Sequence, residues 1–168
     1  MRIAPLALLV LTVAVSGVAA AQQVGDADAG IRVYKEFGAC WDCHGWSGLG
    51  GLPHVGGDND GMDVGPPLVS AKLDRAAMIE MVSCGRPDGF HPPFAVGAWT
   101  EARKCYGKTA KDLGEAQAPA APPNRLTEGQ IANVVAWVID VLQGKSMTKA
   151  NCLRYFGVAQ SIVCDVFP

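Results

Sequence analysis

The sequence has little charge of either sign and no long run of like charges. Among its 168 residues, 14 Lys and Arg nearly balance 16 Asp and Glu, which leaves a formal net charge of −2. A nucleic-acid-binding protein normally carries a basic patch, and a membrane-spanning helix needs roughly 20 consecutive apolar residues. The sequence has neither feature and no internal repeat. These absences exclude nucleic acid as a partner, a coiled coil and stable insertion into a membrane.

Glycine, proline and cysteine are what the sequence does have, with 20 Gly, 11 Pro and six Cys. Glycine and proline favour turns and loops, whereas no segment has the alternating pattern of a convincing strand. The length suits one domain of ordinary size. We therefore expect an all-α protein with long ordered loops, in which each of the six cysteines has to be accounted for.

The first segment has the three-part pattern of a secretory signal peptide. Arg2 precedes an apolar stretch from Leu6 to Val15, and Ala19-Ala20-Ala21 supplies a small-residue cleavage site. An uncleaved membrane anchor is the alternative, but the apolar run is too short for it. We expect residues 1–21 to be removed, which places the mature protein in the oxidising periplasm, where disulfides persist.

Helical periodicity is clearest over residues 127–143. Thr127 and Gln130 form a capping box, an apolar stripe follows from Ile131 to Leu142, and Gly144 ends the pattern. Further helices are expected over residues 26–39, 74–83 and 148–155. These helices predict one domain over residues 22–147 and a C-terminal extension over residues 148–168.

The chemistry of the chain is concentrated in Cys40-Trp41-Asp42-Cys43-His44. The pattern C-x-x-C-H is the attachment motif for c-type haem. Two thiols three positions apart on a helical turn can each bond one vinyl group of the same porphyrin, and His44 then lies beneath the iron as the proximal ligand. A thioredoxin-like redox pair, a zinc site and a local disulfide are the alternatives. The motif predicts one covalently attached haem c, held by Cys40, Cys43 and His44.

With this motif, the chain resembles the class I cytochromes c of bacterial type, which hold one haem. The resemblance covers residues 26–145 and also includes the turn Gly65-Pro66-Pro67-Leu68, a middle helix and an amphipathic helix bearing Trp137. It implies a small cytochrome c fold whose N- and C-terminal helices cross near the haem, with Tyr34 or Phe37 against Trp137. It also implies that the carbonyl of Pro66 accepts a hydrogen bond from His44 Nδ1, which fixes the tautomer of the imidazole.

The sixth ligand is where the chain departs from this family, whose members usually supply a methionine from a Met-Pro segment after the middle helix. Here the segment reads Gly89-Phe90-His91-Pro92-Pro93-Phe94. We expect His91 to bind the iron opposite His44, which makes both axial ligands histidine. The other candidates are His54, Met62, Met78, Met81 and Met147, or an open position. Arg86 either pairs with a haem propionate or is simply solvated.

Four cysteines remain after haem attachment, an even number in an exported protein, and they allow three pairings. Pairing between nearest neighbours gives Cys84–Cys105 and Cys152–Cys164, which is the simplest arrangement. The first bond would brace the segment that carries His91, and the second would staple the C-terminal extension. Each would stabilise the fold by restricting the unfolded chain.

The function expected from these features is electron transfer by a periplasmic monohaem cytochrome that is not an enzyme. Its partners would be redox proteins, namely a donor dehydrogenase and an electron acceptor. A haem enzyme or a gas-binding haem sensor with an exchangeable distal ligand is the alternative. A local basic cluster is either a solvated face or a docking surface for an acidic redox partner, and its members are Arg103, Lys104, Lys108 and Lys111.

Overall fold

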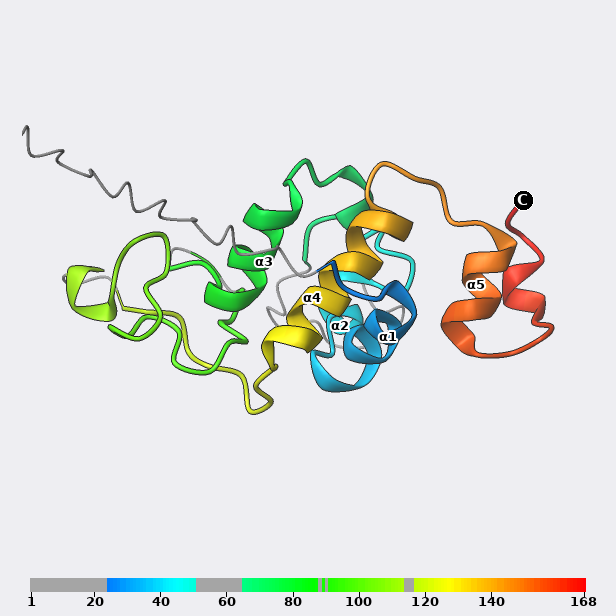
Figure 1. The fold of residues 1–168 in the computed structure, drawn as a ribbon. Coiled ribbons are helices and arrows are strands. Elements are labelled where there is room, and N and C mark those ends of the chain that lie inside the picture. Colours follow the sequence, from blue (N-terminus) through cyan, green and yellow to red (C-terminus); the bar gives the residue numbers. More distant parts are fainter. Residues whose placement is uncertain (1–23, 51–64, 88, 90, 114–116) are drawn as a thin grey trace, which may run out of the picture.

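Short helices joined by loops make up the structure, a computed structural model that describes residues 24–50, 65–87, 89, 91–113 and 117–168 (Figure 1). These residues contain no strand, and isolated bridges join only Ala95 to Leu126 and Cys105 to Lys108. The all-α prediction is therefore confirmed for the described part of the chain. The predicted signal peptide (1–21) lies outside it, as do His54 and Met62.

The four predicted helical segments are all present, each within one or two residues of its expected ends. The α-helices are α1 Ala27–Arg32, α2 Trp41–His44, α3 Arg75–Cys84, α4 Glu128–Trp137 and α5 Lys149–Phe156. The π-helical turns η1 Val33–Phe37 and η4 Val138–Leu142 continue α1 and α4. Short 3-10 turns are η2 Leu68–Ser70, η3 Ala110–Leu113 and η5 Ile162–Cys164. No helix within the described residues has the length and apolar composition needed to cross a membrane.

Each long helix begins where a side chain accepts hydrogen bonds from the unpaired amides of the first turn. Asp74 Oδ1 accepts a bond of 2.8 Å from the amide of Ala77 at the start of α3. At the start of α4, the predicted capping box forms in both directions between Thr127 and Gln130. The sequence determines these helix starts locally, because donor and acceptor lie within one turn of each other.

Helices α1 and α4 cross in close contact at Gly30 (Figure 1). A Cβ atom on Gly30 would lie 2.1 Å from the backbone oxygen of Asn133 and 2.9 Å from Cβ of Trp137. The side chain of Asn133 also accepts a 2.8 Å hydrogen bond from the amide of Asp26. Only glycine allows the two backbones to approach this closely, so Gly30 sets the distance between the helices.

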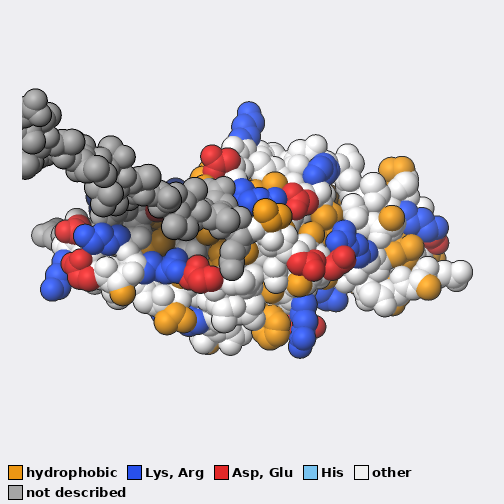
Figure 2. All heavy atoms as spheres, in the orientation of Figure 1, with side chains coloured by type: hydrophobic (Ala, Val, Ile, Leu, Met, Phe, Trp, Pro, Cys, Tyr) orange, Lys and Arg blue, Asp and Glu red, His pale blue; other side chains and the backbone are white. Residues whose placement is uncertain are grey.

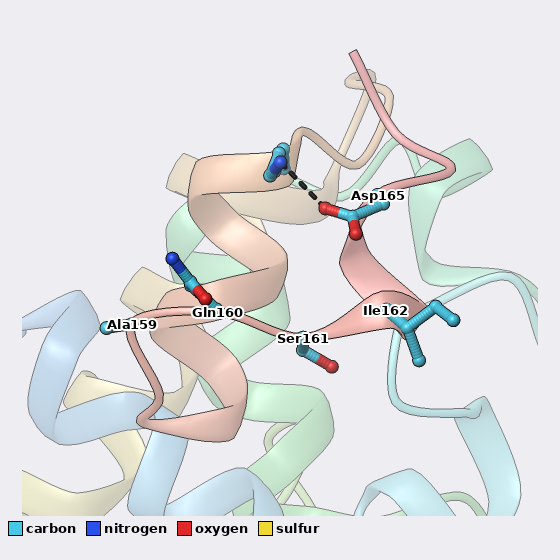
Figure 3. A pocket seen from close by; sticks show the side chains of 6 residues that line it. Ala159, Gln160, Ser161, Ile162 and Asp165 are labelled. Carbon is cyan, nitrogen blue, oxygen red and sulfur yellow. Dashed lines mark ion pairs between the residues drawn. The ribbon is translucent and has the colours of Figure 1, made fainter.

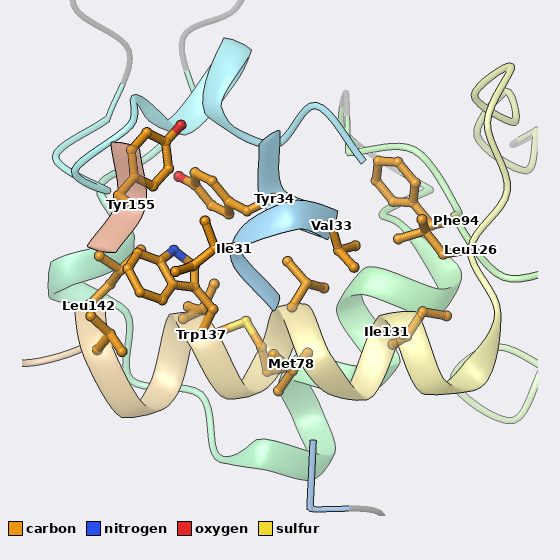
Figure 4. Close-up of a cluster of buried hydrophobic side chains, with 14 of the residues drawn as sticks. Ile31, Val33, Tyr34, Met78, Phe94, Leu126, Ile131, Trp137, Leu142 and Tyr155 are labelled. Atoms are coloured by element: carbon orange, nitrogen blue, oxygen red, sulfur yellow. The ribbon is translucent and has the colours of Figure 1, made fainter. Parts of the chain in front are cut away.

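The core lies between α1, α3 and α4, and Figure 4 shows its buried side chains. Tyr34 and Trp137 are both fully buried there. The resemblance to class I cytochromes c implied that Tyr34 or Phe37 would pack against Trp137. In the structure, Tyr155 of α5 contacts both of the buried rings, with centroid distances of 6.4 Å to Tyr34 and 6.2 Å to Trp137. The C-terminal extension therefore completes the aromatic core.

Both predicted disulfides are present, Cys84–Cys105 and Cys152–Cys164. All four of these cysteines are buried. The second bond joins α5 to η5, and the extension is further attached to the N-terminal helices by a hydrogen bond of 3.1 Å from Lys35 Nζ to the carbonyl of Tyr155. The extension is thus a helical segment packed on the core.

Candidate functional site

The single turn of α2 holds His44 directly after the two unpaired cysteines. The amide of His44 donates to the carbonyl of Cys40 at 2.9 Å, and the amide of Cys40 donates to the carbonyl of Tyr34 at 2.9 Å. The Tyr34 hydroxyl then donates to the carbonyl of Gly45 at 2.7 Å. Burial raises the pKa of Tyr34, so that its hydroxyl keeps the proton that it donates. The motif is therefore hydrogen-bonded to Tyr34, near the start of η1.

The ring of His44 has a fixed tautomer. Its Nδ1 lies 2.8 Å from the carbonyl oxygen of Pro66, the partner that the resemblance to class I cytochromes c implied. Because a carbonyl only accepts, Nδ1 must carry the proton, which leaves the lone pair of Nε2 free to bind a metal ion. A Cβ on Gly65 would lie only 2.8 Å from Nδ1 and Cε1 of His44. Glycine before Pro66 is thus what allows the turn to approach the imidazole.

His91 lies in an extended segment that runs back along the end of α3. Gly85, with φ of 65°, turns the chain after α3, and the amide of Arg86 donates to the carbonyl of His91 at 3.0 Å. Farther along, Arg125 Nη1 donates to the carbonyls of Pro93 and Ala95 at 2.9 and 3.0 Å. The carbonyl of His91 and the backbone that follows it are therefore fixed by hydrogen bonds.

The imidazoles of His44 and His91 lie close together although 47 positions separate them in the chain. Their ring centroids are 6.4 Å apart, and the ring planes are inclined at 46°. A metal–imidazole bond is about 2.0–2.1 Å long, and the bonding nitrogen lies roughly 1.1 Å from the ring centre. Two imidazoles on opposite sides of one metal ion therefore have centroids roughly 6.3 Å apart. The observed separation fits a single metal ion between the two rings.

Both histidines are held in the neutral form that binds metals. Burial is the largest cause and lowers the pKa of His91 to about 4, with positive charge on His44 and Arg86 acting in the same direction. The nearby Pro92 carbonyl offsets part of this effect, yet His91 Nδ1 is buried without a hydrogen-bond partner among the described residues. Burial likewise lowers the pKa of His44, against the opposing hydrogen bond to Pro66. A half-buried imidazole with a buried, unpaired nitrogen fits a ligand that the protein holds ready.

Cys40 and Cys43 are free thiols, in contrast to the other four cysteines. Burial raises the pKa of Cys40 to about 12, and burial also raises the pKa of Cys43. Cysteines that exchange disulfides have lowered pKa values, so this environment does not favour the thioredoxin-like alternative. In the part of the chain that the structure describes, no group of three or more His, Cys, Asp or Glu gathers as a zinc site would require.

The alternative methionine ligands that fall within the described residues pack elsewhere. Met78 and Met147 are buried in the core, 4% and 7% exposed, and Met81 lies on α3 within 3.8 Å of the Tyr106 hydroxyl. Arg86 is close enough to His91 for its charge to lower the pKa of that imidazole. The structure therefore brings His91 close to the ring of His44, which follows Cys40 and Cys43 in the chain and is hydrogen-bonded to Pro66. Arg86 lies beside His91.

Arg125 is the residue that sequence reasoning missed. It lies just after a stretch rich in proline and alanine, where an arginine is normally solvated. The structure instead uses its guanidinium to hold the carbonyls on either side of Phe94, whose ring lies edge-on to His91 at 6.0 Å. Nothing local in the sequence indicates this role, because Arg125 and Pro93 are brought together only by the fold.

Among the described residues, the surfaces away from the two histidines have no comparable arrangement. Figure 3 shows a hollow in the C-terminal extension, beside the 2.7 Å ion pair of Lys149 and Asp165, and it contains none of the predicted site residues. Acidic and basic side chains are interspersed over the face seen in Figure 2. In the predicted basic cluster, Arg103 pairs with Glu128, and Lys104 Nζ lies 3.5 Å from Glu101.

Comparisons of the chain with protein-family models, with curated proteins and with solved structures find no match. The geometry of the two histidines is therefore the main structural support for a functional interpretation.

Proposed function

We propose that the protein is a periplasmic monohaem c-type cytochrome that carries single electrons between redox proteins. The observation that carries the proposal is the pair His44 and His91, two neutral, half-buried imidazoles whose centroids are 6.4 Å apart. Cys40 and Cys43, the two cysteines without a disulfide partner, immediately precede one of these rings. Two thiols and an axial histidine in this order are what covalent haem attachment requires.

Each residue of the site has a separate role in holding this group. Cys40 and Cys43 would form the two thioether bonds that attach the haem, and His44 and His91 would bind its iron. Pro66 keeps the proton on His44 Nδ1, so that Nε2 presents its lone pair and the imidazole becomes more basic. When bound, the haem supplies an iron that cycles between Fe(III) and Fe(II). Arg86 contributes positive charge beside His91.

Histidine in both axial positions favours an electron carrier over an enzyme or a gas sensor. A sensor or an enzyme needs an exchangeable distal position, whereas hydrogen bonds from Arg86 and Arg125 hold the carbonyls of His91 and Pro93 in place. Exchanging a methionine thioether for a more basic imidazole also favours Fe(III) and lowers the reduction potential. The proposal therefore includes a potential below that of carriers with one histidine and one methionine.

Electron paramagnetic resonance (EPR) of the oxidised holoprotein tests the proposal directly. We expect a low-spin ferric signal typical of two imidazole ligands, and no thioether–iron charge-transfer band. His91→Met should raise the midpoint potential and introduce that band. Met78→Leu is the matched control, because Met78 lies in the core and should leave the signal unchanged. A charge-transfer band in the unmodified protein, or a high-spin ferric signal, contradicts the proposal.

Variants of the two cysteines test whether the haem is covalently attached to the chain. Cys40→Ser together with Cys43→Ser should give a protein from which acidified organic solvent extracts the haem, whereas Cys152→Ser with Cys164→Ser should keep it attached.

The redox partners of the protein would be a donor dehydrogenase and an acceptor protein. If the basic cluster docks an acidic partner, raising the ionic strength should slow electron transfer.

A further inference from the structure

The end of α3, just before the segment of His91, is bound by a long insertion. This clamp segment, residues 97–113, is joined to α3 by the disulfide Cys84–Cys105. Trp99 Nε1 donates to the carbonyl of Cys84 at 2.7 Å, and the hydroxyl of Tyr106 donates to the carbonyl of Gly85 at 2.8 Å. The last carbonyls of a helix lack hydrogen-bond donors within the helix. Here Trp99 and Tyr106 of the clamp segment supply donors for them.

The clamp segment is itself held in an unusual conformation. Trp99 and Tyr106 have φ values of 65° and 51°, in the left-handed region that residues with bulky side chains rarely adopt. Such conformations persist only where the surroundings enforce them. Here the amide of Tyr106 donates to Glu80 Oε1 at 2.8 Å, and the amide of Ala110 donates to the carbonyl of Trp99 at 2.8 Å. Both aromatic side chains are thereby aimed at the end of α3.

The bound helix end is in direct contact with the backbone of His91. A Cβ on Gly85 would lie 2.3 Å from the carbonyl oxygen of His91, so the two backbones touch at this position. The next amide, that of Arg86, donates to the same oxygen at 3.0 Å. A displacement of Cys84 or Gly85 therefore moves His91, because no side chain or solvent separates the two segments.

We propose that Trp99, Tyr106 and the Cys84–Cys105 disulfide are positioning residues that fix the distal ligand His91 through the end of α3. This inference rests on the proposed function, because it takes His91 as the ligand opposite His44. The disulfide is a permanent brace: Cys105 is fully buried and Cys84 is only 2% exposed, which shields both sulfur atoms from thiol exchange. The clamp segment raises the barrier to opening the distal position and leaves the proximal side unchanged.

Carbon monoxide binding to the reduced holoprotein measures this barrier, since the gas can bind only after His91 leaves. Tyr106→Phe removes one hydrogen bond and keeps the ring. We expect it to increase the binding rate about fivefold, the factor that corresponds to one ordinary hydrogen bond. Trp99→Phe should act in the same direction, and Cys84→Ala with Cys105→Ala should increase the rate at least as much. The ferric EPR signal should become heterogeneous in the same variants.

The matched control removes the other disulfide, as Cys152→Ala with Cys164→Ala. It should lower stability and leave the carbon monoxide rate unchanged, because the C-terminal extension packs beside Tyr34 and Trp137. Far-UV circular dichroism verifies that each variant is folded, and Tyr106→Phe is conservative enough to retain the fold. An unmodified protein without the two-imidazole signal overturns both the proposed function and the clamp. The two-imidazole signal with unchanged rates in Tyr106→Phe and Trp99→Phe overturns the clamp alone.

Discussion

Replacing Gly30 with alanine tests the close contact between helices α1 and α4. The new Cβ would lie 2.1 Å from the backbone oxygen of Asn133, whereas real Cβ contacts are hardly ever shorter than 3.0 Å. The helices α1 and α4 must therefore separate by about 0.9 Å, and forcing extra atoms into such a contact costs about 1–3 kcal/mol. Alanine recovers about 0.5–1 kcal/mol through helix propensity and reduced chain entropy. We expect a net loss of about 1–2 kcal/mol for Gly30→Ala.

Gly129→Ala is the matched control, because Gly129 also lies in a helix but a Cβ there meets no atom within 4 Å. It should raise stability by a few tenths of a kcal/mol. Urea unfolding followed by far-UV circular dichroism measures both changes, with a constant slope against urea showing that the unfolded state is unaffected. A Gly30→Ala variant as stable as Gly129→Ala would refute the close crossing of α1 and α4.

Three further predictions concern individual groups. Gly65→Ala should displace the ring of His44 and broaden the ferric EPR signal, since the new Cβ would lie 2.8 Å from that ring. The Arg154 hydrogen bond lowers the pKa of Asp28 from 3.8, so this pair stabilises the fold above that pH and loses its contribution as the pH falls. Urea unfolding of Asp28→Asn should show a deficit of a few tenths of a kcal/mol at neutral pH, which vanishes in acid. Burial raises the pKa of Tyr155 to about 12, and ultraviolet titration should find its step there, absent from Tyr155→Phe.

Local features of the sequence were enough to predict much of the fold. The capping box at Thr127 places the start of α4 because both of its members lie in one turn. The disulfides Cys84–Cys105 and Cys152–Cys164 follow the nearest-neighbour rule, since each closes a local loop. The hydrogen bond from His44 to Pro66 was expected from the resemblance to cytochromes c, which supplied the partner that spacing alone does not reveal.

Packing of the C-terminal extension lay beyond local patterns. The sequence predicted a C-terminal extension after residue 147 that is closed by a disulfide. In the structure, Tyr155 of this extension contacts both Tyr34 and Trp137 in the core. A single tyrosine in a short helix does not indicate which distant rings it will meet. That choice depends on how α1 and α4 cross, and the crossing depends on Gly30 in contact with Asn133.

The sequence by itself determined the residue types of the candidate site, the helices that carry them and the cysteines left for disulfides. These features depend on neighbours within a few positions, where side-chain chemistry and backbone preference decide the outcome. Only the tertiary structure decided that the ring centroids of His44 and His91 lie 6.4 Å apart, and that Arg125 and Tyr106 hold the segment around His91. Those contacts join residues more than 20 positions apart, so they exist only once the helices have packed.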